Sequence, residues 1–355
     1  MDGQRQIDCD VLVIGAGPAG STAARFAAQK GVSVILLERR EKIGLPVRCA
    51  EYVPLPVDRY IRLNRPGLMV QTVRSMLTYI PGESVQETAL PGVMICRDLL
   101  DQGLAELAVK AGAGLKTALQ AWTRKDDQVT ARGKDGLVTI VSRVIIGADG
   151  PLSQVGRWMG SPQKEFLLAA QYRVLLKKAL DQTRIYFRPY IAGGYGWLFP
   201  KGERANLGIG IDPSLNKGLK PLLNQFRLEL VREGLIEEEI IGQGGGLVPV
   251  GGLTTVTKGN MILTGDAAGT CHPITGAGVG NALISGQMAG EAAAEAVRKG
   301  DLRPLQGYEQ ELIGHLGHSL NRAVRKRKAL IAQWNKVDFS ENIHRNWIAF
   351  KPYYR

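Results

Sequence analysis

The 355-residue sequence lacks three features that would place it in a specialised class of protein. Its four cysteines include no C-x-x-C pair, so the pattern predicts neither a disulfide framework nor a zinc site, and no other metal is expected. No apolar run reaches the ~18 continuous residues that a transmembrane helix needs. The first residues carry no apolar signal region, which favours a cytoplasmic location.

Acidic residues are scarce relative to basic ones, with 33 Asp and Glu against 45 Lys and Arg and a net charge of +12. This excess indicates an anionic partner. The densest basic cluster, residues 322–328, lies on a predicted C-terminal helix that continues to Trp334. Such a helix can rest peripherally on acidic headgroups at the inner face of a membrane, or simply carry solvated charge. No nucleic-acid recognition motif accompanies the charge, so no nucleic-acid partner is expected.

A short apolar run opens directly into the pattern G-x-G-x-x-G near the N-terminus. The run 10–14 is followed by Gly15, Gly17 and Gly20 and then by a helical pattern. Gly15 allows the tight turn, Gly17 lets the backbone approach a pyrophosphate, and Gly20 lets the helix pack on the sheet. Glu38 closes the next predicted strand, where its carboxylate can accept hydrogen bonds from ribose hydroxyls. The pattern predicts a dinucleotide site, although a glycine-rich turn without a ligand is the alternative.

A second glycine-rich segment, far downstream, indicates which dinucleotide to expect. The apolar run 260–264 is typical of a strand, and Asp266 after it can hold the ribityl hydroxyls of a flavin nucleotide. Pro273 and the glycines that follow open a helix of small residues through Ala296. The positive N-terminus of that helix would face the flavin N1 and C2 carbonyl edge, where negative charge accumulates on reduction. We therefore predict FAD as the cofactor.

Three further segments extend the pattern to a known family. Between the two halves, a strand-like run ends in Gly-Ala-Asp-Gly at residues 147–150, and the three motifs together resemble the flavoprotein fold of p-hydroxybenzoate hydroxylase. Residues 44–51 and 194–201 are similar to the Pro-Val-x-Cys and Tyr-x-Trp-x-Phe-Pro-Lys motifs of the geranylgeranyl reductase family. The resemblance runs from about residue 8 to about residue 300. It implies an α/β fold with a Rossmann-like FAD-binding domain of the GR2 type and an inserted antiparallel-sheet substrate domain.

The length of the chain agrees with this division, because 355 residues exceed the usual size of a single core. We assign the domains as a discontinuous FAD-binding domain (1–56, 91–163 and 258–300), a substrate-binding domain (57–90 and 164–257) and a C-terminal helical segment (301–355). Apolar and alternating patterns predict a helix and a set of strands at 98–111 and at 116–123, 128–132, 137–146, 182–187, 196–200 and 206–211. Residues 134–136 predict a hairpin turn.

The resemblance also implies roles for individual residues. Arg97 would reach the FAD phosphates or ribityl chain, with a surface arginine at a helix start as the alternative. Cys49 would lie in the loop that faces the isoalloxazine ring, where it could pack against the flavin, tune the pocket or donate a proton. The alternative for Cys49 is a small buried hydrophobe. Further implied cofactor contacts are Ala19, Arg39, Ala50, Ala121, Asp149, Gly276, Gly278 and Val279.

The other cysteines have weaker claims to a catalytic role. Cys9 and Cys96 fall in predicted strands, where we expect them in the core. Cys271 stands next to His272, and the pair resembles a reactive thiol with its base. A flavin can carry out the redox chemistry alone, so the sequence leaves open whether Cys49 or Cys271 is catalytic.

Aromatic residues alternate along one predicted strand. Tyr195, Trp197 and Phe199 would share one face, because successive side chains of a strand point to opposite sides. Such a face can line an apolar tunnel, since an isoprenoid chain is recognised mainly by burying its surface at ~25 cal/mol per Å². Ordinary core packing is the alternative. The resemblance implies a reductase that saturates C=C bonds of a polyprenyl (geranylgeranyl-type) lipid, quinone or related isoprenoid by hydride transfer from flavin N5.

Several questions stay open at the level of sequence. No second G-x-G-x-x-G occurs, so the external electron donor is NAD(P)H bound transiently, a ferredoxin or another carrier protein. An FAD-dependent monooxygenase or halogenase would share all three FAD motifs. A non-catalytic electron-carrier flavoprotein is the second alternative, and it would need no apolar tunnel. The length of the substrate chain, the number of bonds reduced and the oligomeric state are not determined by these patterns.

Overall fold

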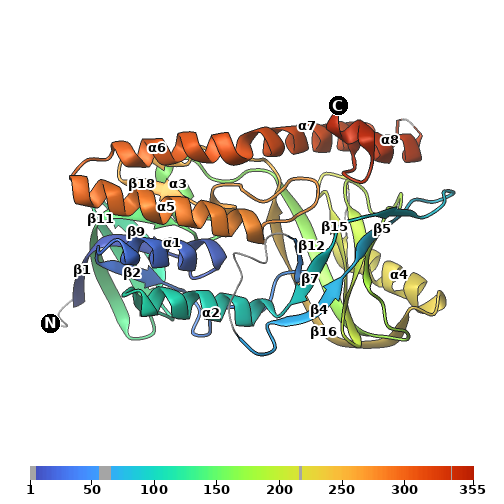
Figure 1. The fold of residues 1–355 in the computed structure, drawn as a ribbon, viewed down its shortest axis with the longest axis horizontal. Coiled ribbons are helices and arrows are strands. Elements are labelled where there is room, and N and C mark those ends of the chain that lie inside the picture. Colours follow the sequence, from blue (N-terminus) through green and yellow to red (C-terminus); the bar gives the residue numbers. More distant parts are fainter. Residues whose placement is uncertain (1–4, 56–64, 216–217, 337) are drawn as a thin grey trace.

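The computed structural model describes residues 5–55, 65–215, 218–336 and 338–355. Residues 57–64 of the predicted substrate-binding domain, and residues 1–4 at the end used for the location prediction, lie outside these ranges. The described chain forms three sheets, with helices packed along them (Figure 1). None of the helices in the described ranges has the length and hydropathy needed to cross a bilayer.

The eight-stranded sheet has a parallel centre in the order β18-β11-β1-β2-β8. β17 pairs antiparallel with β18, and the β9 and β10 strands continue from β11. Its central strands are buried on both faces, which explains why residues 11–14 and 34–37 are continuous apolar runs. The strands are β1 (Arg5–Ile14), β2 (Val34–Leu37), β8 (Gly114–Lys116), β9 (Gln120–Lys125), β10 (Gln128–Gly133), β11 (Gly136–Gly147), β17 (Thr257–Lys258) and β18 (Met261–Leu263).

One predicted strand is wrong in detail. The pattern at 116–123 predicted a single strand, but β8 ends at Lys116 and β9 begins at Gln120. Ala118 between them has φ +57°, a left-handed conformation that breaks a strand, and its amide donates to the Arg40 carbonyl. The predicted hairpin turn at 134–136 is confirmed, because β10 and β11 pair antiparallel with Gly133 opposite Gly136.

The seven-stranded sheet is mostly antiparallel, in the order β16-β12-β15-β14-β13-β5-β6, and only the β13 and β5 pair within it is parallel. A three-stranded antiparallel sheet, β3-β7-β4, completes the set. The strands are β3 (Tyr52–Pro54), β4 (Met69–Val73), β5 (Ser75–Tyr79), β6 (Gln86–Thr88), β7 (Gly92–Ile95), β12 (Phe166–Leu176), β13 (Gln182–Tyr186), β14 (Tyr195–Lys201), β15 (Arg204–Ile211) and β16 (Ile236–Pro249). Figure 1 shows α4 (Leu219–Arg232) beside this sheet, at the opposite end of the molecule from β1.

Three helices lie against the parallel strands: α1 (Pro18–Gln29), α2 (Arg97–Lys110) and α5 (Val279–Lys299). The small residues of α5 serve close packing against α1, because a Cβ atom on Gly286 would lie 2.3 Å from the Ala19 carbonyl oxygen. A short α3 (Gln154–Met159) and a 3-10 turn, η2 (Gly265–Ala267), follow β11 and β18. Cys96 was predicted to lie in a strand, but it follows β7 and caps α2, because the chain turns into the helix there.

The C-terminal segment is helical and runs along the long axis of the molecule, from the parallel sheet to the antiparallel one (Figure 1). It comprises α6 (Arg303–Leu312), η3 (Ile313–Gly317), α7 (His318–Ala332), α8 (Phe339–Asn346) and η4 (Lys351–Tyr354). α7 ends before Trp334, two residues short of the predicted end, and the Trp334 ring is buried with its Nε1 donating to the Pro189 carbonyl.

Candidate active site

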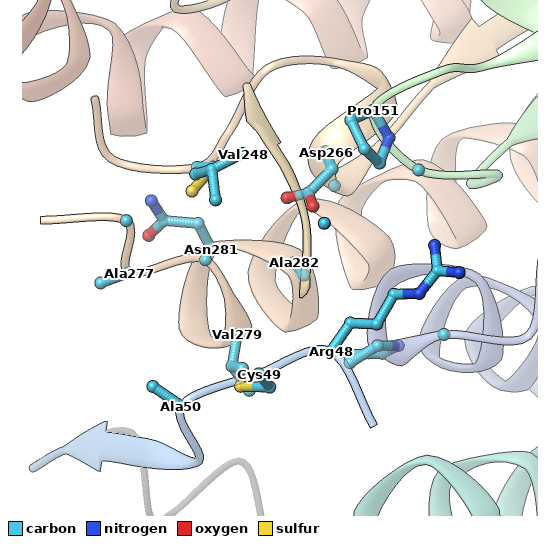
Figure 2. Close-up of a pocket in the computed structure, with 18 of the residues that line it drawn as sticks. Arg48, Cys49, Ala50, Pro151, Val248, Asp266, Ala277, Val279, Asn281 and Ala282 are labelled. Carbon is cyan, nitrogen blue, oxygen red and sulfur yellow. The ribbon is translucent and has the colours of Figure 1, made fainter. Parts of the chain in front are cut away.

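A cavity of about 860 Å³ is lined by residues of both large sheets. Every predicted cofactor residue except Gly20 lines it, and so do the predicted substrate residues Tyr195, Trp197 and Phe199. Figure 2 shows Arg48, Cys49 and Ala50 on one loop and Val279 at the start of α5, all lining the same pocket as Asp266. The structure thus brings together segments that are more than 200 residues apart in the chain.

The glycine motif forms one end of this cavity. A Cβ atom on Gly20 would lie 1.8 Å from the Gly15 carbonyl oxygen, so Gly20 serves helix packing and does not face the cavity. Gly17 lines the cavity and has no atom within 4 Å of the position of a Cβ. Gly17 is also the N-cap of α1, and no side chain caps this helix end. The open space and the free first-turn amides suit a phosphate group.

Glu38 lies directly after β2 and faces the same end of the cavity. Its two carboxylate oxygens accept hydrogen bonds from the amides of Ala16 and Arg40, each at 2.9 Å. These bonds fix the carboxylate beside the glycine turn. Each oxygen keeps a further lone pair for a hydroxyl donor, which is the arrangement expected for ribose binding.

Asp149 has a mainly local role, although it lines the cavity. Its carboxylate accepts hydrogen bonds from the Ser153 hydroxyl at 2.5 Å and from the Gln154 amide at 2.6 Å, and so holds the start of α3. Burial raises the pKa of Asp149, while these donors oppose the rise. The Asp149 carboxylate therefore stabilises the loop after β11, whose backbone lines the cavity.

Asp266 is different, because no hydrogen bond joins its carboxylate to any donor within the described residues. Burial raises the pKa of Asp266, and the distant charge of Arg97 only partly opposes this. The N-terminus of α5, with Gly278 as N-cap and no side-chain cap, opens on the same cavity. A half-buried carboxylate without a donor is costly, so this site suits a ligand that supplies hydroxyl groups.

Cys49 also lines the cavity. Its Sγ accepts a hydrogen bond from the amide of Glu51 at 3.2 Å. Burial lowers the pKa of Arg97, but Asp101 and Cys49 raise it by more, so that the net shift is upward. Arg97 is therefore not a surface arginine: its Nε donates to Asp101 at 2.8 Å and its side chain lines the cavity.

No hydrogen bond joins Cys271 to His272 within the described residues, and the surroundings of the pair do not favour a reactive thiol. Burial raises the pKa of Cys271 well above its usual value, which favours the unreactive thiol. Burial lowers the pKa of His272 to about 4, and its Nδ1 accepts the amide of Thr275 at 3.3 Å. Its Nε2 lies 3.4 Å from the hydroxyl of Tyr353. The ring is therefore held as neutral imidazole, facing the C-terminal segment.

The aromatic residues of β14 continue into a larger cluster. Tyr195 lies 6.2 Å from Trp197 between ring centroids, and Trp347 from the C-terminal segment lies 5.2 Å from Tyr195. Phe187 packs against Trp347 at 5.1 Å. The Tyr195 hydroxyl donates to the Thr275 carbonyl at 2.5 Å, which joins this wall to the loop before α5. The lining of the cavity thus includes both the polar residues around the glycine turn and this aromatic wall.

Several cavity residues have no counterpart in the sequence prediction. Glu51 and Arg48 belong to a segment that was singled out for Cys49, whereas Trp347 and Tyr353 come from the C-terminal segment beyond the resemblance. The family motif around residue 49 could have indicated Arg48 and Glu51 as cavity residues. No local pattern marks the aromatic pair, because only tertiary packing brings α8 and η4 over the antiparallel sheet.

The basic cluster on the C-terminal helix is only partly a surface feature. Arg327 was grouped with it, but its side chain is buried, and its guanidinium donates to Asp212 at 2.8 Å and to the Gly193 carbonyl at 3.2 Å. The Nζ of Lys326 donates to two C-terminal carbonyls. Arg325 and Lys328 are exposed. The helical period explains the split, since consecutive residues of a helix point in different directions.

Comparison with known proteins identifies the family. Residues 166–248 match the geranylgeranyl reductase catalytic domain, and residues 13–76 match the NAD(P)-binding Rossmann-like domain. The chain is 34% identical over 346 residues to a digeranylgeranylglycerophospholipid reductase of Methanocella arvoryzae, covering 88% of this chain and 85% of that protein. Another protein of that name, from Methanopyrus kandleri, is 37% identical over 314 residues, with 83% of each chain covered. This chain belongs to the geranylgeranyl reductase family.

Solved structures agree with this membership of the geranylgeranyl reductase family. A geranylgeranyl bacteriochlorophyll reductase-like protein from Thermoplasma acidophilum has a TM-score of 0.82 and 28% identity, covering 96% of this chain and 97% of its own. A flavin-dependent brominase has a TM-score of 0.74 at 18% identity, covering 94% of this chain and 93% of its own, and so shares the fold alone. The predicted fold class is confirmed. The prediction of a flavin-dependent oxidoreductase that reduces C=C bonds is also confirmed.

Replacing Asp266 by Asn should separate cofactor binding from stability. The neutral isostere removes a carboxylate that is costly to ionise in the folded protein, so we expect a higher melting temperature of the flavin-free protein at pH 7. This gain should shrink as the pH falls through the raised pKa of Asp266 and vanish below about pH 3.8, the usual pKa of Asp, because both states then bind the proton. Flavin affinity should fall roughly tenfold to a hundredfold with the loss of a charged acceptor.

Calorimetry of the flavin-free protein and flavin titration by fluorescence measure these two effects. Asp181→Asn is the matched control, since Asp181 is exposed and does not line the cavity. Unchanged flavin affinity in the Asp266 variant would remove its role in cofactor binding.

Proposed function

We propose that the flavin is FAD and that the cavity holds it together with an isoprenoid chain. In this proposal the turn at Gly15 and Gly17 binds the pyrophosphate, and Glu38 binds the adenosine ribose. Asp266 accepts hydrogen bonds from the ribityl chain, and the N-terminus of α5 faces the ring. The open space at Gly17, the unpaired Asp266 carboxylate and two uncapped helix ends on one cavity support this placement.

We further propose that the sheets correspond to two domains. The eight-stranded sheet would be the centre of an FAD-binding domain (1–56, 91–163 and 258–300), and the seven-stranded sheet the centre of a substrate-binding domain (57–90 and 164–257), with 301–355 as a helical segment across both. The membership of the strands supports this division. β8 to β11, β17 and β18 belong to the first sheet, whereas β5, β6 and β12 to β16 belong to the second.

The proposed substrate is a lipid with geranylgeranyl-type chains. The observation that carries this proposal is the continuity of one cavity from the glycine turn to the aromatic wall of β14. Apolar and aromatic walls bind a hydrocarbon chain by area burial and exclude water. The names of the archaeal relatives, digeranylgeranylglycerophospholipid reductases, support the same class of substrate.

The residues around Cys49 suit the proton transfer that the reaction requires. The reduced flavin, when bound, supplies a hydride to one carbon of an isolated double bond. A proton must reach the other carbon, and we propose that the thiol of Cys49 donates it. The resulting thiolate would be stabilised by the Glu51 amide, which already donates to Sγ, and by the charge of Arg97. An isolated alkene accepts hydride poorly. Much of the rate enhancement must therefore come from holding the chain in a fixed orientation beside the flavin.

The electron donor and the membrane complete the proposal. An external carrier, NAD(P)H or a ferredoxin-like protein, would reduce the flavin. We propose a peripheral location at the cytoplasmic face of a membrane, with the exposed Arg325 and Lys328 on anionic headgroups. The proposed substrate class supports this location, because a phospholipid with long isoprenoid chains resides in a bilayer.

Replacing Trp197 by Ala tests the proposed reaction. Anaerobically reduced parent protein mixed with a geranylgeranyl lipid should be reoxidised while the product gains two hydrogens per bond. The variant should keep its flavin and lose roughly tenfold to a hundredfold in kcat/KM, since it loses one buried aromatic wall residue. Trp122→Ala is the matched control, because Trp122 is 51% exposed and lies outside the cavity.

Stopped-flow flavin absorbance and product mass spectrometry give the result. A product that carries an added oxygen or halogen, formed only in air, would contradict the reductase reaction. Equal kinetics of the two tryptophan variants would contradict the placement of the substrate.

Charge reversal of Arg325 and Lys328 to Glu tests the membrane contact. We expect weaker co-sedimentation with anionic vesicles, and a parent binding that falls as salt is raised. Reversal of Arg298 and Lys299 on α5 changes the net charge by the same amount and serves as the control. Equal sedimentation of both variants and the parent would mean that Arg325 and Lys328 are ordinary solvated charges that make no membrane contact.

A further inference from the structure

Glu51 lines the cavity, and its carboxylate is held by donors from distant parts of the chain. Its side chain is buried, and its carboxylate accepts three hydrogen bonds: from Lys201 Nζ at 2.7 Å, from Asn206 Nδ2 at 3.0 Å and from the backbone amide of Arg97 at 3.0 Å. Its backbone has φ +67°, which is a left-handed conformation that favours glycine. A glutamate in this conformation is held there by its surroundings.

The three donors come from three separate elements. Lys201 ends β14, Asn206 lies on β15, and Arg97 begins α2. The first two belong to the antiparallel sheet that carries the aromatic wall, and α2 lies along the parallel sheet. Glu51 therefore joins the two halves of the molecule at one carboxylate.

The two residues before Glu51 are fastened to the antiparallel sheet as well. The Cys49 carbonyl accepts a hydrogen bond from Gln171 of β12 at 2.9 Å, and the Ala50 carbonyl accepts one from Asn206 at 3.0 Å. The Cys49 Sγ accepts the Glu51 amide, as described above. Two of these three contacts thus involve Glu51 itself or Asn206, which also donates to the Glu51 carboxylate.

We propose that Glu51 is a positioning residue that holds the thiol of Cys49 at its place in the cavity by clamping the loop 49–51 to β14, β15 and the start of α2. The inference rests on the proposed function, in which Cys49 acts beside the flavin. The clamp sets the direction of the thiol, whereas Glu51 itself transfers no proton. Through Lys201 and Asn206, it also couples the position of Cys49 to the sheet that binds the isoprenoid chain.

A purely conformational role is the competing explanation, and glycine at position 51 distinguishes the two. Glu51→Gly removes the carboxylate but adopts φ +67° without strain. If the residue only forms a turn, the glycine variant should match the parent or exceed its stability. If the carboxylate is a clamp, Glu51→Gly should behave like Glu51→Ala.

The first readout is the alkylation of Cys49 by iodoacetamide in the flavin-bound protein, followed by peptide mass spectrometry. We expect Glu51→Ala and Glu51→Gly to raise the rate at Cys49 roughly tenfold, because charge-assisted hydrogen bonds that restrict the loop are lost. Glu51→Gln keeps an acceptor of the same shape and should fall between these variants and the parent. Cys9 in the same digest reports general loosening of the fold, because it lies on β1 away from the cavity lining, and its rate should not change.

The second readout is the kinetics of lipid reduction. The glycine and alanine variants should lose roughly tenfold in kcat, with KM changed by less than about threefold, since the aromatic wall that binds the chain is intact. Glu51→Gln should recover part of the loss. Glu229→Gln is the matched control. Glu229 lies on α4, outside the cavity, and its carboxylate accepts a charge-assisted hydrogen bond from Arg188 at 3.2 Å.

Lys201→Met provides an independent variant in case the Glu51 variants fail to fold. This variant removes one hydrogen-bond donor to Glu51 but keeps an apolar side chain of similar length. It should show a smaller increase in the alkylation of Cys49 and a smaller loss in kcat. Parent-like alkylation of Cys49 and parent-like kcat in Glu51→Gly or in Lys201→Met would overturn the clamp. The alkylation needs no substrate, so its outcome is distinct from a failure of the parent protein to reduce polyprenyl lipids, which would overturn the proposed function instead.

Discussion

Close backbone packing between α1, α5 and the turn after β1 is the constraint on which the rest of the site depends. Gly20 lets α1 rest on the Gly15 carbonyl, and Gly286 lets α5 rest on the Ala19 carbonyl. A Cβ atom at either position would overlap these carbonyl oxygens, so any larger residue would force the helix away from its neighbour. The packing places two uncapped helix N-termini on one cavity, so the positive ends of both helices are available to an anionic cofactor.

The proposed reaction also requires that the cavity bring a polar flavin nucleotide and an apolar isoprenoid chain into contact. The loop 49–51 lies where the parallel sheet and the antiparallel sheet approach each other, and it contributes the thiol to the cavity. The three carbonyls of this loop and the Glu51 carboxylate all accept hydrogen bonds from other parts of the protein, which fixes the loop in place. Elsewhere in the cavity lining, the carboxylate of Asp266 has no hydrogen-bond donor among the described residues, and it lies on the side assigned to the flavin.

Local patterns predicted the features that depend on local geometry. The glycine turn, the buried runs of β1 and β2 and the alternating aromatics of β14 each follow from a short period or a fixed spacing, and the structure contains them. The strand at 116–123 failed because Ala118 turns to the left-handed region to let its amide reach Arg40, a contact that no neighbour in sequence reveals. Local patterns therefore describe elements better than the breaks between them.

Features that depend on distant parts of the chain could not be predicted in the same way. Arg327 looked like one more surface charge, yet it is buried against Asp212 of the antiparallel sheet. Trp347 contributes to the aromatic wall only because the C-terminal segment returns across the molecule. Glu51 stood beside the predicted thiol, but its three donors lie 46, 150 and 155 residues away in sequence. Spacing within one motif gives no information about such partners.

The most direct test of the account is whether an isoprenoid lipid and the flavin share one cavity. Oxidised, flavin-bound protein titrated with a geranylgeranyl lipid should show a saturable change in the visible flavin spectrum, because the chain would enter the cavity beside the ring and displace water from it. Detergent alone should not produce this change. Saturable binding of the lipid with an unchanged flavin spectrum would contradict the account, since the two ligands would then occupy separate sites.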